Sequence, residues 1–146
     1  MFFDTHAHLH DPKFDSDRDE LCRSLKEHNI GLVLNASCCV ETSYTTVEYT
    51  KRWDFVYGAV GVHPHDTKDM KDSDIDILHN LAKEPKIQAI GEIGLDYYYD
   101  FTPRDIQKAR FRDQLLLARE LNMPVIIHDR DAHNDTLNIL RDFTDL

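Results

Sequence analysis

The chain has little positive charge and no long apolar run. Its 17 basic residues are outnumbered by 27 acidic ones, which leaves a formal net charge of −10. This balance argues against a broad basic surface that binds nucleic acid electrostatically, although bound divalent cations can supply positive charge locally. No stretch approaches the roughly 20 apolar residues needed to cross a bilayer, so we expect no membrane partner.

Cysteine and targeting signals are also scarce. The three cysteines, Cys22, Cys38 and Cys39, form no CxxC pair, and we expect them to be free thiols in a reducing compartment. The N-terminal residues lack the basic and apolar regions of a secretory signal, so a cytoplasmic location is the expectation.

The sequence alternates between short apolar segments and helical patterns, as expected for one α/β domain over residues 1–146. The predicted strands are residues 2–3, 31–36, 55–60, 87–90 and 125–127. The first predicted helix is capped by Ser16, and others cover about 41–52 and the region of Ile75 to Leu81. A longer helix starts at Pro103 and stops at Asn122, and a last one begins near Ala132.

Regular strand–helix alternation indicates a parallel sheet, for which two architectures are open. One is an open doubly wound sheet, and the other is a TIM-type (β/α)8 barrel of which this chain holds about the first five β/α units. Glycine-rich phosphate loops are absent from the sequence, which removes the best support for the doubly wound sheet.

Residues able to bind metals follow the apolar segments. His6 and His8 follow the first segment, His63 and His65 the third, Glu92 and Asp96 the fourth, and His128 and Arg130 the fifth. Because the carboxyl ends of parallel strands meet at one rim, these residues are predicted to converge although they are far apart in the sequence.

His6, His8, Glu92 and His128 are the predicted metal ligands. Residues two apart in an extended segment point the same way, so His6 and His8 can hold one divalent cation. Glu92 can bridge two cations through its two oxygens, and His128 reaches the second. Two cations roughly 3.5–4 Å apart would activate a water molecule and clamp a phosphate. Zn, Mn, Mg and Ni all remain candidates.

Four residues at the same rim are candidate substrate-binding residues: His63, His65, Asp96 and Arg130. Arg130 suits a phosphate oxygen, although an ion pair with Asp129 or Asp131 is an equally good interpretation. Asp96 is expected either to orient a ligand or to cap its loop.

The remaining histidines and the tyrosine cluster are interpreted structurally. His10, His28, His79 and His133 have no relation to a strand end and are expected to play structural roles. For Tyr97, Tyr98 and Tyr99, packing over the barrel mouth is favoured over stacking on a nucleobase.

Four segments together resemble the TatD family of metal-dependent deoxyribonucleases: residues 4–9, 59–65, 89–97 and 124–132. The resemblance implies a TIM barrel, a two-metal centre and hydrolysis of DNA phosphodiester bonds. It assigns His6 and His8 to one metal, Glu92 to the bridge as the catalytic carboxylate, and His128 to the other metal.

The chain is shorter than the barrel that this family is expected to form. Such a barrel takes roughly 250 residues, and the family supplies a further His and an Asp from later strands, which lie beyond the end of this chain. The chain is therefore expected to be a truncated N-terminal part, with little nuclease activity alone and with an exposed edge that favours self-association. A small-molecule amide or ester hydrolase remains an alternative, although such enzymes often carry a carboxylated lysine where Glu92 falls. An inactive fragment or assembly module is another.

Overall fold

The computed structural model describes residues 1–146, which form one five-stranded parallel sheet. Its strands follow one another in chain order, each hydrogen-bonded to the next, so the predicted parallel α/β arrangement is confirmed. The strands are β1 (Phe2–Ala7), β2 (Ile30–Ala36), β3 (Val56–Val60), β4 (Ile87–Asp96) and β5 (Val125–Arg130).

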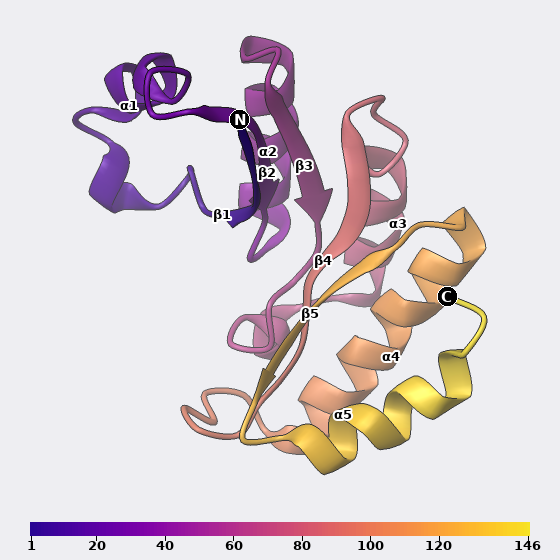
Figure 1. Ribbon diagram of the computed structural model, residues 1–146. Helices are drawn as coiled ribbons and strands as arrows, with labels where there is room; N and C mark the ends of the chain where they lie inside the picture. The colour runs from indigo at the N-terminus through magenta and orange to yellow at the C-terminus, as the bar shows by residue number, and fades with distance from the viewer.

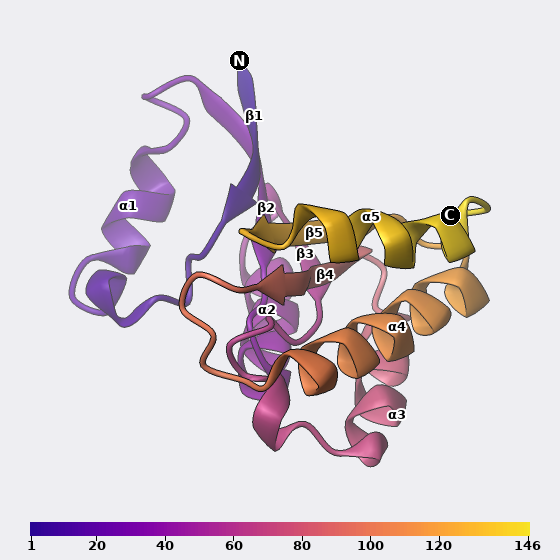
Figure 2. The ribbon, with the colours of Figure 1, turned by 90° about the horizontal axis from the view of Figure 1, so that it is seen from below.

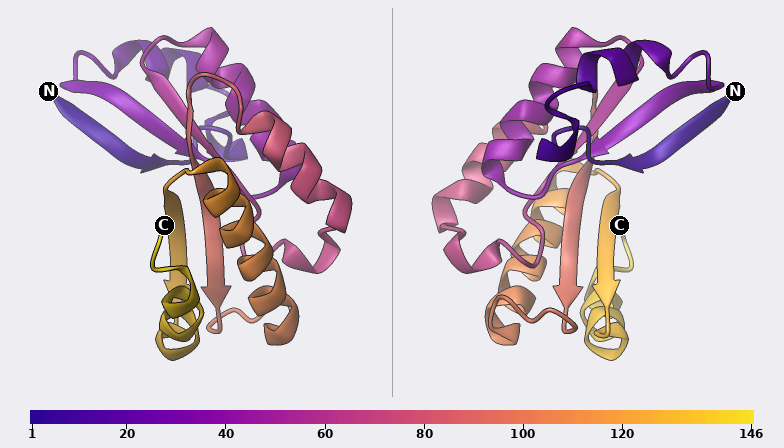
Figure 3. Two further views of the ribbon diagram at one scale, coloured as in Figure 1. Left: turned by 90° about the vertical axis from the view of Figure 1, so that its right-hand side faces the viewer. Right: turned by 90° about the vertical axis from the view of Figure 1, so that its left-hand side faces the viewer.

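Five α-helices connect the strands and cover the sheet. They are α1 (Arg18–Ser24), α2 (Val40–Arg52), α3 (Asp72–Leu81), α4 (Arg104–Leu121) and α5 (His133–Leu140), with short 3-10 turns at Pro12–Phe14, Thr67–Asp69 and Arg141–Phe143. The sheet curls into half a barrel with α2, α3 and α4 along its outer side (Figures 1 and 3). Figure 2 shows α1 at the opposite side of the molecule from α3, α4 and α5. No helix combines the length and the apolar character needed to cross a membrane.

The main core lies between the outer helices and strands β3 to β5. Phe111 and Leu115 from α4 lie one turn apart and are at most 1% exposed, and Ile90, Ile93 and Leu95 from β4 pack in the same cluster. A residue buried to this extent contributes about 1.5–3 kcal/mol to folding. The core therefore holds β4 firmly along its length.

Two predicted helix boundaries need correction. Ser16 does not cap the first helix, because α1 begins at Arg18 with Asp17 before it. Pro103 precedes α4 rather than occupying its first turn, and the helix begins at Arg104. Asn122 ends α4 in the left-handed conformation, with φ of 52° and ψ of 47°, as its position predicted.

Three strands are longer than the apolar segments predicted. They continue through polar residues, so that most of the candidate site residues belong to the strands rather than to the loops after them. These residues are His6 in β1, Glu92 and Asp96 in β4, and His128 and Arg130 in β5.

The concave face of the sheet carries a groove of about 490 Å³ lined largely by apolar side chains. Phe3 and Leu32 in this groove are 48% and 39% exposed, and β1 and β5 each have an unpaired edge. In a closed barrel this face would be the filled interior. Self-association through the open edges stays a prediction, which sedimentation velocity at increasing chain concentration would test.

Gly94 sets how closely β4 and β5 approach each other beside the predicted metal ligands. It pairs with His128 in the sheet, and its φ of +143° is one that side chains rarely adopt. A Cβ atom there would lie 2.0 Å from the carbonyl oxygen of His128. We expect Gly94→Ala to lower the free energy of unfolding by about 2–4 kcal/mol, measured by urea denaturation. An unchanged value would contradict this contact.

Candidate metal centre

Three strands bring the four predicted ligands together at one end of the sheet. His6 lies in β1, and His8 is the first residue after that strand. Glu92 lies in the middle of β4, and His128 lies in β5. Glu92 is only 8% exposed, and its backbone N–H donates to the carbonyl of Ser37, which follows β2. The carboxylate is therefore fixed between the two outer strands of the half-barrel.

The two oxygens of Glu92 face two different histidine groups. Oε2 lies 3.0 Å from Nε2 of His6 and 3.5 Å from Nε2 of His8. Oε1 lies 3.0 Å from Nδ1 of His128. One carboxylate thus has a histidine pair on one side and a single histidine on the other.

Hydrogen bonds to the far ring nitrogens orient two of these histidines. Nδ1 of His8 lies 2.8 Å from the carbonyl oxygen of Ala36, which can only accept, so Nδ1 carries the proton and Nε2 offers its lone pair to the cluster. Nε2 of His128 lies 2.9 Å from Oδ2 of Asp96, which leaves Nδ1 facing Glu92. Such outer contacts are typical of metal-binding histidines.

The ligand spacings fit a divalent cation. Nitrogen and oxygen ligands at roughly 2.1 Å from a tetrahedral ion lie roughly 3.4 Å from each other. The three separations among His6 Nε2, His8 Nε2 and Glu92 Oε2 are 3.2, 3.0 and 3.5 Å. The donors, two imidazoles and a carboxylate, suit Zn, Mn or related ions.

The charge state of Glu92 also suits a cation. Burial raises the pKa of its carboxyl, but the hydrogen bond with His128 and the nearby His63 and His6 outweigh burial and lower the pKa to about 2. The pKa of His128 is raised, first by its hydrogen bond to Glu92. Glu92 is therefore an anion throughout the physiological range, as a metal ligand must be.

Asp96 is fully buried and contacts both its own loop and the predicted metal ligand His128. Its Oδ2 accepts hydrogen bonds from His65 and His128 at 2.9 Å each, and its Oδ1 accepts from the backbone N–H groups of Tyr98 and Tyr99. Burial raises its pKa, but the N–H of Tyr99 and the two histidines outweigh burial and lower the pKa to about 2. One carboxylate therefore joins the loop to the cluster.

His63 lies among the clustered imidazoles without bonding to Glu92. Its ring centre is 4.3 Å from that of His128 and 4.4 Å from that of His65, and it is 8% exposed. Burial, reinforced by His128, lowers its pKa from 6.5 to about 3. His63 is therefore a neutral imidazole at the predicted substrate side.

The lowered pKa of His63 predicts loss of stability in acid for the metal-free chain. Between about pH 6.5 and 3 the unfolded chain binds a proton at this residue and the folded chain does not, so stability falls as pH falls through that range. The contribution between pH 7 and pH 5 is up to about 2 kcal/mol. Urea denaturation with a chelator should show a smaller fall for His63→Gln than for the parent, whereas the exposed His28→Gln should match the parent.

Arg130 does not form either predicted ion pair. Its guanidinium lies 4.1 Å from the ring centre of Tyr98 and 4.7 Å from that of Tyr99, and it contacts no carboxylate. Asp129 pairs with His133 instead, at 2.7 Å. The positive charge of Arg130 is therefore free for a ligand.

His10, Cys38 and His8 form a second group of nearby potential ligands, which sequence reasoning missed because His10 was interpreted structurally. Its hydrogen bonds oppose metal binding. Nδ1 of His8 donates to Ala36, and Nδ1 of His10 accepts from the amide of Asn35, whose oxygen already accepts from Leu9. The structural interpretation of His10 is thus the better one.

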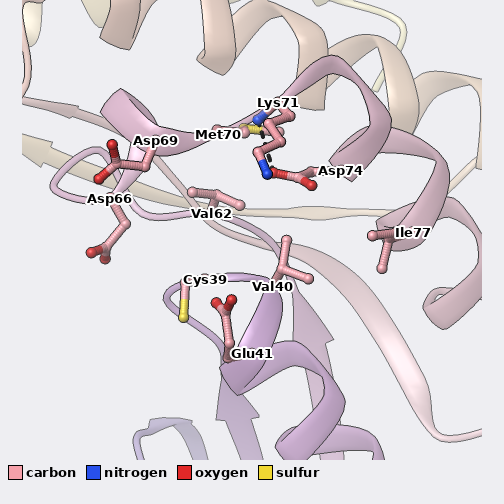
Figure 4. Close-up of a pocket in the computed structure, with 10 residues that line it drawn as sticks. All are labelled: Cys39, Val40, Glu41, Val62, Asp66, Asp69, Met70, Lys71, Asp74 and Ile77. Carbon is pink, nitrogen blue, oxygen red and sulfur yellow. Dashed lines mark hydrogen bonds between the residues drawn. The ribbon is translucent and has the colours of Figure 1, made fainter.

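A separate pocket of about 420 Å³ lies between the start of α2 and the segment leading into α3 (Figure 4). Glu41, Asp66, Asp69 and Asp74 line it, and the backbone N–H of Lys71 donates to Asp74. None of the predicted ligands lies there. The predicted chemistry is therefore at the rim of the sheet and not in this pocket.

Proteins similar to this chain include a metal-dependent hydrolase and an exonuclease. A family model described as TatD related DNase matches residues 3–145. The chain is 41% identical over 142 residues to YabD of Bacillus subtilis, described as a metal-dependent hydrolase, covering 97% of this chain and 56% of YabD. It is 34% identical over 143 residues to the 3'-5' ssDNA/RNA exonuclease TatD of Cronobacter sakazakii, covering 98% of this chain and 54% of that protein.

A solved structure also matches the fold of this chain. YJJV, a TatD homologue from Escherichia coli K12, superposes with a TM-score of 0.90 at 26% identity, over 97% of this chain and 55% of YJJV. The chain thus spans about half the length of the relatives it matches.

Proposed function

The chain belongs to the family of TatD-related DNases, and from that premise we propose that it supplies the N-terminal part of a barrel that hydrolyses DNA phosphodiester bonds with two divalent cations. The arrangement of Glu92 carries this proposal. Its two oxygens face His6 and His8 on one side and His128 on the other, at 3.0 to 3.5 Å. A carboxylate that bridges two ions directs one oxygen to each, and this division of histidines would allow that.

Each residue of the cluster has a separate task in the proposed reaction. His6 and His8 would hold one cation, His128 would hold the other, and Glu92 would serve as a ligand to both. Bound cations of this type lower the pKa of water and neutralise charge on a phosphoryl group. Asp96 retains the Nε2 proton of His128, so that Nδ1 is available as a ligand.

The substrate is held by residues outside the ligand set. Arg130 offers a free guanidinium that matches two phosphate oxygens, and His63 offers a neutral imidazole. Because the chain has a net charge of −10, this local positive charge and the cations, rather than a basic surface, would attract the phosphate. The Cronobacter sakazakii relative is named for action on single-stranded DNA and RNA, which supports a nucleic-acid phosphodiester as the substrate.

Anomalous scattering tests the proposal directly. Crystals of the chain soaked in Mn²⁺ or Zn²⁺ should show one peak near His6, His8 and Glu92 and a second near Glu92 and His128, and crystals kept in chelator should show neither. Absence of any peak at Glu92 would end the proposal. In solution, any release of nucleotides from labelled single-stranded DNA by the chain should require divalent cations and exceed hydrolysis of an amide substrate.

A further inference from the structure

A group of exposed aromatic side chains lies beside the metal cluster, and we call Tyr98, Tyr99, Phe101 and Arg130 the aromatic rim. The three aromatic residues are 59%, 46% and 63% exposed. Tyr97 instead packs against the main core and its hydroxyl donates to Asp135 in α5, whereas Tyr98 and Tyr99 are exposed and do not pack over the mouth as predicted. The aromatic rim thus exposes three aromatic side chains to solvent.

The members of the aromatic rim contact one another, and Tyr98 lies edge-on to Tyr99 with ring centres 4.9 Å apart and planes at 88°. Tyr99 and Phe101 stack with ring centres 5.3 Å apart and planes 30° from parallel. Arg130 lies over both Tyr98 and Tyr99. Every other arginine of the chain except Arg141 pairs with a carboxylate. Arg130 has no carboxylate partner, so its positive charge is not neutralised by a neighbouring side chain.

The aromatic rim is tied to the candidate metal centre through His65 and Asp96. The ring of His65 lies 5.3 Å from Tyr99, 4.9 Å from Phe101 and 6.1 Å from His128. Asp96 holds the backbone of Tyr98 and Tyr99 while it accepts from His128. A ligand seated on the rim would therefore have a neighbouring group within reach of the metal ligands.

We infer that the aromatic rim is a nucleobase-stacking subsite for single-stranded nucleic acid, with Arg130 facing the phosphate of the stacked nucleotide. This inference rests on the proposed function. A base can lie on a free aromatic face whatever its identity, and guanidinium matches phosphate geometry. Bases in a duplex are covered on both faces by their neighbours, so the subsite selects unpaired strands.

Binding measured without metal separates this subsite from the hydrolytic centre. Fluorescence anisotropy in chelator would compare a labelled short oligodeoxythymidylate with an abasic strand of the same length, which keeps the phosphates and lacks the bases. We expect the parent chain to bind the thymidylate more tightly than both the abasic strand and a duplex. Equal affinity for the thymidylate and the abasic strand, or for the thymidylate and the duplex, would overturn the inference.

Variants identify the surface. Tyr98→Ala and Phe101→Leu should each weaken thymidylate binding by about 5- to 100-fold. Both should leave binding of the abasic strand unchanged. Leucine is chosen at Phe101 because it keeps apolar volume without a ring face. Phe101→Tyr should retain the parent affinity. Tyr44→Ala should retain it too, because it removes a tyrosine of similar exposure, 51%, that lies in α2 and not in the rim. Unchanged affinity in both rim variants would refute the subsite.

These experiments can reject the stacking subsite without rejecting the hydrolytic centre, and the hydrolytic centre without rejecting the subsite. Binding to the rim is measured in chelator, so it does not depend on an ion at Glu92. If rim variants lose base-dependent binding while crystals show no ion at Glu92, the subsite stands and the hydrolytic proposal falls. If ions are present and the rim variants bind normally, the reverse holds.

Discussion

Replacing Glu92 by glutamine is expected to weaken divalent-cation binding by more than about 100-fold. The amide has the same size, but it loses the negative charge and replaces one of the two oxygens that face the histidine groups. Loss of an outer partner of a metal ligand costs about 10- to 100-fold in affinity, and Glu92 is itself the proposed shared ligand. Isothermal titration of the metal-free chain with Mn²⁺ and Zn²⁺ measures the effect.

The same substitution should abolish hydrolysis where the parent shows it. The cations are proposed to supply several kcal/mol of transition-state stabilisation, so their loss corresponds to a rate reduction of about 10³-fold or more. Glu120→Gln is the matched control, since Glu120 has an exposed carboxylate that faces only His79. Equal metal affinity in Glu92→Gln and Glu120→Gln would remove Glu92 from the site.

The convergence of the ligands could be predicted from the sequence because it follows from topology. Parallel strands separated by helices run toward one rim, so that β1, β4 and β5 can bring His6, Glu92 and His128 together. The strand lengths could not be predicted from apolar runs. Beyond residue 90, β4 alternates between buried apolar residues such as Ile93 and Leu95 and polar residues that face the rim. The alternation, and not a continuous run, was the usable signal.

The interaction partners of individual side chains could not be predicted from the sequence. Arg130 lies between two acidic neighbours, yet its guanidinium stacks on Tyr98 and Tyr99, which lie before the preceding helix in the chain. Which group Arg130 contacts depends on the conformation of the loop that follows β4. Asp96 fixes this conformation by accepting hydrogen bonds from two backbone N–H groups. The sequence shows that Asp96 is polar and near a strand end, but not that it is fully buried with four donors.

Asp96→Asn should be strongly destabilising because four hydrogen-bond donors surround this side chain. One oxygen faces two histidines and the other faces two backbone N–H groups. An amide must place its NH₂ group against one of these donor pairs. Breaking a buried interaction of this kind costs about 3–5 kcal/mol, measured by urea denaturation at pH 7. Asp100→Asn, in the same loop but on an exposed ion pair with Arg104, should change stability by about 1 kcal/mol or less.

The pH dependence of that difference provides a second readout. The pKa of Asp96 is lowered from 3.8 to about 2, so its stabilisation is fully present above the unfolded value and disappears as pH falls toward 2. The gap in stability between parent and Asp96→Asn should therefore narrow as pH falls from 4 to 2. NMR titration should also show a lower pKa for His128, whose Nε2–H loses its anionic acceptor. A purely structural role for Asp96 would leave the His128 titration unchanged, whereas a fall in its pKa together with weaker metal binding marks Asp96 as the residue that positions His128.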